Sequence, residues 1–209
     1  MPTGGGFSLW KWVRKRPKPD RRAVWQEVAR SVGGTFLPGK RSSADKVLVA
    51  HGPWTIELET YTVHTGEASV TYTRARALFA GQVDIELRIR KRNVFDTILE
   101  NVGLGGVDPG HRAFAERFVV KGRPETRLRS LVTPRLIEAL LAEPKVSVKV
   151  KDASRKDRKI HGPRTREASA QLTGVIREAN RLVNLIAVTR EILSSLEGAG
   201  MAARERVGE

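Results

Sequence analysis

The stretch Val83–Lys91, VDIELRIRK, decides the fold class. Its apolar and charged residues alternate without interruption, with Val83, Ile85, Leu87 and Ile89 separated by Asp84, Glu86, Arg88 and Arg90. Because successive side chains of a strand point to opposite faces, this alternation predicts a strand with one buried face and one wet face. Similar patterns occur in KVLVA (46–50), WTIELETYTV (54–63), SVTYTRARALFA (69–80) and KVSVKVKD (145–152). The short links between successive strands predict an antiparallel meander.

Helical patterns lie around these strands. Asp20 is a plausible N-cap for a first helix, and Thr133 followed by Pro134 begins another. A longer helix is predicted from about 165 to 196, where apolar residues recur at helical spacing. We therefore predict one α+β domain over 21–197, with an antiparallel sheet of about six strands, helices on one face and the long helix closing the core. Residues 1–20 are predicted to form a basic, aromatic tail, and 198–209 a frayed C-terminal tail.

Composition excludes several kinds of chemistry. The 209 residues include no cysteine, which removes disulfides, thiolate catalysis and cysteine-bound zinc. No run approaches the roughly 18 consecutive apolar residues that a membrane-spanning helix needs. The first cations follow a short apolar patch, which is the reverse of a secretory signal. We expect a cytoplasmic bacterial protein, peripheral at the inner membrane if the anchor described below is correct.

Positive charge is concentrated in two segments. The formal net charge is +15, yet residues 1–22 alone carry seven basic and one acidic residue, and 151–166 carry seven basic and two acidic residues. The remainder of the chain is close to neutral. Such clusters attract polyanions, either the phosphates of nucleic acid or anionic lipid headgroups.

The first basic segment, FSLWKWVRKRPKPDRR (7–22), has the composition of an interfacial membrane anchor, in which indole rings lie beside cations. The alternative is a tail packed on its own domain. The candidate membrane-binding or anion-binding residues here are Trp10, Lys11, Trp12, Arg14, Lys15, Arg16 and Lys18.

The second basic segment follows the strand at 145–152. It forms one cationic face with Arg88 and Arg90 if the strand at 83–91 is its neighbour, and such a face binds phosphate without reading bases. A solvated charged face is the alternative. The candidate residues are Lys149, Lys151, Arg155, Lys156, Arg158 and Lys159.

Little in the sequence indicates catalysis. The four histidines, His51, His64, His111 and His161, lack the spacing of a helical metal site, and two of them belong to His-Gly-Pro turns. A pairing of His51 with His161 is left open. We expect no catalytic residue, no metal and no cofactor.

The predicted C-terminal helix has an apolar face broader than one sheet contact needs. Most such faces are core, but the additional stripe of Leu185, Val188 and Ile192 is a candidate contact for a protein partner or a second copy of the chain.

The run FAERFVVKGRPETRLRSLVTPRLIEALLAEPKVSVKVKD (114–152), with DPGHRAF (108–114) and GVIREANRLVNLI (174–186), resembles an uncharacterised bacterial domain-of-unknown-function family. In that family an aspartate-led turn precedes an F-x-V-x-G strand, a short helix, a leucine-rich helix and a valine-rich strand. The resemblance implies a fold and no activity. The matching positions are Asp108, Phe114, Phe118, Val120, Gly122, Leu131, Leu136, Leu140, Leu141, Val146 and Val148.

The sequence therefore favours a non-catalytic binding or adaptor protein that associates through its cationic segments with an anionic surface, first of all the inner leaflet of the cell membrane. Non-specific binding of nucleic acid is the alternative. A hydrolase that uses one of the histidines is the third hypothesis.

Overall fold

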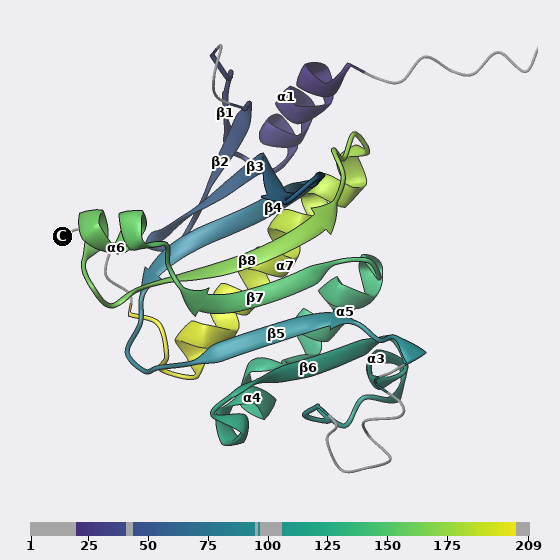
Figure 1. Cartoon of the computed structure of the whole chain (residues 1–209), viewed down its shortest axis with the longest axis vertical. Helices are drawn as coiled ribbons and strands as arrows, with labels where there is room; N and C mark the ends of the chain where they lie inside the picture. Colours follow the sequence, from purple (N-terminus) through teal and green to yellow (C-terminus); the bar gives the residue numbers. More distant parts are fainter. Residues whose placement is uncertain (1–19, 41–43, 95, 97–105, 204–209) are drawn as a thin grey trace, which may run out of the picture.

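A computed structural model of the chain describes residues 20–40, 44–94, 96 and 106–203. Eight strands form one sheet in the order β1-β2-β3-β4-β8-β7-β5-β6, and every pairing is antiparallel (Figure 1). The strands are β1 (Thr35–Leu37), β2 (Lys46–His51), β3 (Trp54–Thr65), β4 (Ala68–Ala80), β5 (Glu86–Lys91), β6 (Phe118–Arg123), β7 (Ser147–Asp152) and β8 (Thr165–Thr173).

Helices begin where the sequence supplies caps. The Asp20 side chain accepts hydrogen bonds from the first backbone amides of α1, and Thr133 Oγ1 accepts one from Leu136 N at 3.3 Å at the start of α5. The helices described are α1 (Arg21–Ser31), α3 (Arg112–Ala115), α4 (Glu125–Leu131), α5 (Pro134–Ala142), α6 (Arg155–His161) and α7 (Ala179–Gly198).

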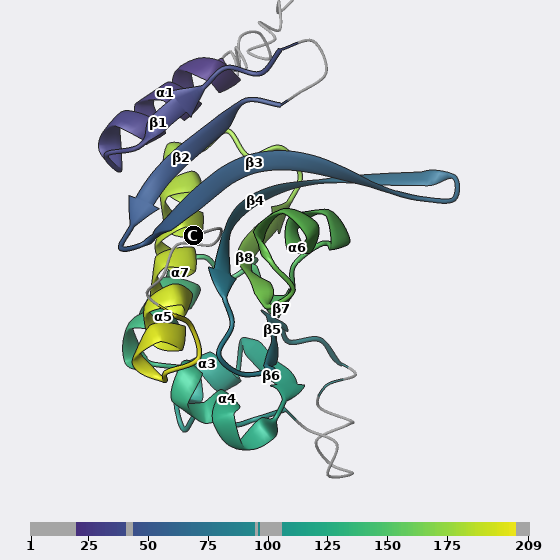
Figure 2. The same ribbon diagram turned by 90° about the vertical axis from the view of Figure 1, so that its left-hand side faces the viewer.

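The sheet has one covered face and one open face. α1, α5 and α7 lie on the covered face, and α7 contacts β3, β4 and β8 there (Figures 1 and 2). Only α6, among the helices described, lies on the opposite side, so the prediction of helices on one face is wrong for that helix. The buried core lies between the sheet and the α7 layer and includes Phe79, Ile89 and Leu182, which have no exposed surface. The open face is therefore the accessible surface of the sheet.

The predicted helix over 165–196 is wrong in its first third, because Thr165–Thr173 is strand β8. Ala168 and Ala170 are compatible with either structure, and the pairing of β8 with both β4 and β7 decides for a strand. Gly174, at φ 95°, ends the strand, and the helix begins only at Ala179. Together with the short β1, β8 raises the strand count from the expected six to eight.

The C-terminal helix has no free apolar stripe. Leu185, Val188 and Ile192 are all fully buried, so the predicted partner contact through these residues is wrong. α7 contacts α1, α4, α5 and three strands, and these contacts explain why its apolar face is broad. The expected frayed tail is also ordered at its start, since Met201 and Ala202 are buried and Ala202 forms a β-bridge with Gly81.

The predicted aromatic and basic stretch from Trp10 to Lys18 falls outside the described residues. The second basic segment, over 151–166, contains helix α6, whose N-cap Ser154 accepts a hydrogen bond from Asp157 N at 3.0 Å. In the part of the chain that the structure describes, no helix has the length and apolar character required to cross a membrane.

Candidate anion-binding face

One row of side chains crosses the open face from β2 to β6. Each member lies directly opposite the next on the neighbouring strand, and strands are about 4.8 Å apart. The alternation of the strands places the whole row on the face away from α7. The row consists of Leu48, Glu57, Arg76, Ser169, Lys149, Arg88 and Lys121.

In the half of this face formed by β2, β3, β4 and β8, charges are paired. Arg76 lies 2.9 Å from Glu57 and 3.4 Å from both Glu167 and Asp157. Arg74 contacts Glu59, and Lys46 contacts Glu57 and Glu59. Burial lowers the pKa of Arg76, but the surrounding carboxylates raise it by more, so the net shift is upward. This half is a neutralised ion-pair network that holds the strands and α6 together.

In the half formed by β5, β6 and β7, four cations lack a direct ion pair in the described part of the chain, and Glu167, which lies opposite Lys151, is paired with Arg74 and Arg76. Lys149 is opposite Arg88, and Arg88 is opposite Lys121. No hydrogen bond or ion pair joins these three side chains, or Lys151, to any other group in the described part of the chain. We call Arg88, Lys121, Lys149 and Lys151 the cationic row. Partial burial lowers the pKa of Lys149, and the positive charges of Arg88 and Lys151 lower it further.

The acids nearest to the cationic row are held by other arginines. Glu86 accepts a hydrogen bond from Arg123 at 2.9 Å. Asp96 accepts two from Arg90, at 2.6 and 2.7 Å, and this pairing lowers the pKa of Asp96 to about 2. Arg90, which the sequence placed in the cationic face, is therefore neutralised. On the β5, β6 and β7 half of the open face, the cations without a direct ion pair in the described residues are those of the cationic row.

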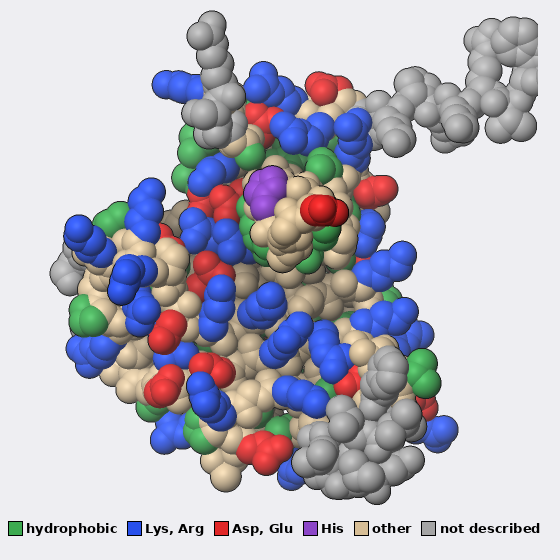
Figure 3. Space-filling model, in the orientation of Figure 1, with side chains coloured by type: hydrophobic (Ala, Val, Ile, Leu, Met, Phe, Trp, Pro, Cys, Tyr) green, Lys and Arg blue, Asp and Glu red, His purple; other side chains and the backbone are tan. Residues whose placement is uncertain are grey.

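The cationic row lines a shallow groove. Its volume is about 270 Å³, and β5, β6 and β7 form its floor. Figure 3 shows lysine and arginine side chains gathered over these strands on the open face. The strands of Arg88 and Lys149 are neighbours, which is the condition that the sequence set for one cationic face. Sequence analysis missed Lys121, although it lies at an outward position of the F-x-V-x-G strand.

The basic residues after β7 lie on α6. Arg155, Lys156 and Lys159 are exposed there, and Ile160 beside them is 62% exposed. Two ion pairs of 3.4 Å tie the helix to the sheet, from Asp157 to Arg76 and from Arg158 to Asp152. α6 therefore carries separate positive charge beside the cationic row.

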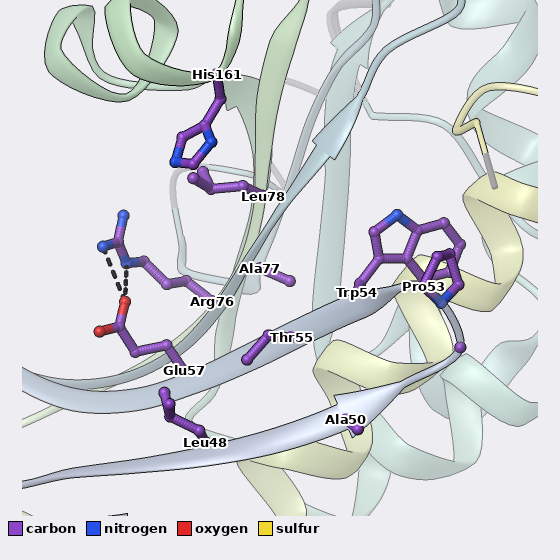
Figure 4. Close-up of a pocket in the computed structure, with 11 residues that line it drawn as sticks. Leu48, Ala50, Pro53, Trp54, Thr55, Glu57, Arg76, Ala77, Leu78 and His161 are labelled. Atoms are coloured by element: carbon purple, nitrogen blue, oxygen red, sulfur yellow. Dashed lines mark hydrogen bonds and ion pairs between the residues drawn. The ribbon is translucent and has the colours of Figure 1, made fainter. Parts of the chain in front are cut away.

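A larger cavity of about 560 Å³ lies on the neutralised half beside α6. Leu48, Thr55 and Leu78 line it from the sheet, the Glu57–Arg76 pair forms one wall, and His161 lines it from the end of α6 (Figure 4). The cavity combines an apolar floor with one ion pair and one imidazole.

The four histidines do not share a site. His51 lies 3.1 Å from Ser194 Oγ and does not line the cavity of His161, so the pairing of these two residues is wrong. Burial and the charge of Arg190 lower the pKa of His51. His64 contacts a neighbouring serine, and His111 caps α3. Within the described ranges, no group of three or more histidine, aspartate and glutamate side chains is arranged to hold a metal ion.

Comparison with known proteins gives little. No family model matches the chain, and no curated protein matches it. Among solved structures, the crystal structure of the mycobacterial trehalose monomycolate transport factor A, TtfA, is similar at a TM-score of 0.45 and 11% identity, over 84% of this chain and 92% of that chain. A likeness at this level carries no argument about function.

Proposed function

We propose that this chain is a non-catalytic binding protein that holds a strand of nucleic acid by its phosphates against the cationic row. The observation that carries the proposal is the register of Lys149, Arg88 and Lys121, three like charges directly opposite one another on adjacent strands. Like charges in such cross-strand positions destabilise a sheet, whereas opposite charges contribute roughly 0.2–1 kcal/mol per pair. A phosphate chain lying over the row replaces this repulsion by attraction.

The shape of the open face favours a narrow chain over a flat membrane. α6 and the β3–β4 hairpin both project beyond the sheet on this side (Figure 2). Lys121 and Lys149 are half-buried at the floor of the groove beside these projections. A planar bilayer meets the projecting elements first, whereas a single phosphate chain can enter and follow the row.

The experiment is a fluorescence anisotropy titration of a labelled oligonucleotide at several salt concentrations. Each phosphate contact on a single strand contributes about −0.7 to the slope of log K against log salt, so four cations predict a slope near −3. The double variant Arg88→Gln/Lys149→Gln should weaken binding and reduce the magnitude of that slope by about 1.4.

The matched control is Arg127→Gln/Arg129→Gln, which removes the same charge from exposed positions of α4. This control should retain the wild-type salt slope. Equal losses in both double variants, or no loss in the first, would refute the proposal. Binding to anionic vesicles without binding to the oligonucleotide would also refute it.

A second candidate function, association with an anionic membrane, is favoured by a different observation. On α6 the exposed Ile160 lies among Arg155, Lys156 and Lys159. Each such cation contributes about 1 kcal/mol near an anionic leaflet, and an inserted isoleucine adds to this. Flotation with phosphatidylserine vesicles tests the idea, since Ile160→Asp should then reduce flotation and leave oligonucleotide binding unchanged.

A further inference from the structure

A pair of tyrosines occupies the open face beyond the ion-pair network. Tyr61 on β3 and Tyr72 on β4 are direct cross-strand partners, with ring centroids 5.4 Å apart and ring planes inclined by 22°. The guanidinium of Arg74 lies over the Tyr61 ring, 4.3 Å from its centroid. The Tyr61 hydroxyl donates a hydrogen bond of 2.8 Å to Gln171 Oε1. These contacts fix Tyr61 as a rigid support beneath its partner.

Tyr72 is the member of the pair that remains available. Its ring is half-exposed, and its contact with Tyr61 accounts for one of its two faces. On its other side Tyr72 lies opposite the small, exposed Thr173 of β8, and it meets no second ring or guanidinium in the part of the chain that the structure describes. A cross-strand tyrosine pair stabilises a sheet by itself, by roughly 0.2–1 kcal/mol. An open aromatic face on the side of the sheet that carries the cationic row is in addition a surface on which a nucleobase can stack.

The tyrosine pair and the cationic row are within reach of one short strand of nucleic acid. Tyr72 precedes Arg76 by four residues on β4, about 13 Å, and Lys149 is two strands away from Arg76, about 10 Å. The diagonal of roughly 16 Å corresponds to about five nucleotides at 3.4 Å per nucleotide. Uncharged Gln171 and Ser147 lie along this diagonal, so no unpaired carboxylate repels a phosphate chain there.

We propose that the bound strand is single-stranded and that Tyr72, supported by Tyr61, stacks one of its bases while the cationic row holds the phosphates. This inference rests on the proposed function and narrows its substrate. In a duplex the bases are already stacked on one another, whereas every base of a single strand offers a free face to an aromatic ring. The platform therefore selects single strands without reading their sequence.

The test compares three fluorescein-labelled probes by anisotropy at fixed salt: a single-stranded oligonucleotide, a hairpin duplex of the same sequence, and an abasic strand with the same number of phosphates. The wild-type chain should bind the single strand more tightly than the other two. Base stacking contributes about 1–3 kcal/mol, so Tyr72→Leu should weaken single-strand binding about 5- to 150-fold and leave the abasic strand unaffected. Tyr72→Phe, which retains the ring, should bind as the wild type does.

The outcomes separate this inference from the proposed function. If wild type and Tyr72→Leu bind all three probes alike, the stacking platform is wrong and phosphate binding stands. If the wild type binds neither the abasic strand nor the single-stranded oligonucleotide, the proposed function itself is wrong. Thermal unfolding shows whether Tyr72→Leu is folded, and Tyr72→Thr, which retains strand propensity, takes its place if it is not.

Discussion

Removing one charge from the cationic row should stabilise the fold. Lys149 faces Arg88 directly, and opposed side chains on neighbouring strands start about 5 Å apart. Two unit charges at that distance repel by about 0.8 kcal/mol in water. Replacing Lys149 by glutamine, which keeps most of the side-chain length, should therefore raise the free energy of unfolding by about 0.5–1 kcal/mol at low salt.

The assay is thermal unfolding followed by circular dichroism. For a chain of this size the gain corresponds to an increase in Tm of about 1–4 °C. Salt should reduce it, because salt screens the repulsion but not the cost of burying the charge, and the Debye length falls from about 10 Å at 0.1 M to about 3 Å at 1 M. The same variant should bind the oligonucleotide less tightly, so stability and binding should move in opposite directions.

The stability difference between wild type and Lys149→Gln should depend on pH. The pKa of Lys149 is lower in the folded chain than the ordinary value of 10.5, so the unfolded chain binds more protons in the interval between the two. The repulsion is complete below the folded-state pKa and is lost as pH rises towards 10.5, where wild type and Lys149→Gln should converge. Lys156→Gln on the exposed surface of α6 is the control and should leave stability unchanged. A loss of stability in Lys149→Gln, or a gain that 1 M salt does not reduce, would refute the electrostatic argument.

Three further substitutions test the packing. Asp96→Asn should lower the free energy of unfolding by about 1 kcal/mol, because it weakens the two hydrogen bonds with Arg90. The difference from wild type should vanish as pH falls from 3.8 through the folded-state pKa of Asp96, about 2. Denaturant unfolding measures both. Gly122→Ala should destabilise the fold by about 1–3 kcal/mol in the same assay, because the new Cβ would lie 1.9 Å from the carbonyl oxygen of Glu86. The control Gly198→Ala lies in open space on α7 and should be neutral or stabilising. Leu185→Ala should lower the free energy of unfolding by about 2–5 kcal/mol, and a change in self-association without that loss would contradict its place in the core.

Strands with regular alternation could be predicted from the sequence, because local pattern and tertiary burial agree in them. β5 is the clearest case, since Leu87 and Ile89 are buried as expected and Arg88 is exposed. β8 could not be recognised in this way, because Ala168 and Ala170 give too little contrast and its place between β4 and β7 depends on partners distant in sequence. The predicted C-terminal helix was too long because it included the residues of β8.

The candidate site could be predicted only in part. The alternation of β7 placed Lys149 and Lys151 outward, but strand order decides which cations they face. Lys121 reaches the row because β6 pairs with β5, and Tyr61 meets Tyr72 because of the register of the β3–β4 hairpin. Arg90 does not add free charge to the expected face, because Asp96, six residues later in the chain, pairs with it. Register and strand order depend on the whole sheet, so they cannot be predicted from the alternation of residues within one strand.

The connection between β7 and β8, which contains α6, is not required for these two strands to pair. Asp152 and Arg166 are already paired across these neighbouring antiparallel strands, so the sheet does not need α6 to bring them together. A two-residue turn could close the same hairpin. The segment from Ser154 to Pro163 lies outside these pairings, so its length and charge can be changed at small cost to the pairing of β7 with β8.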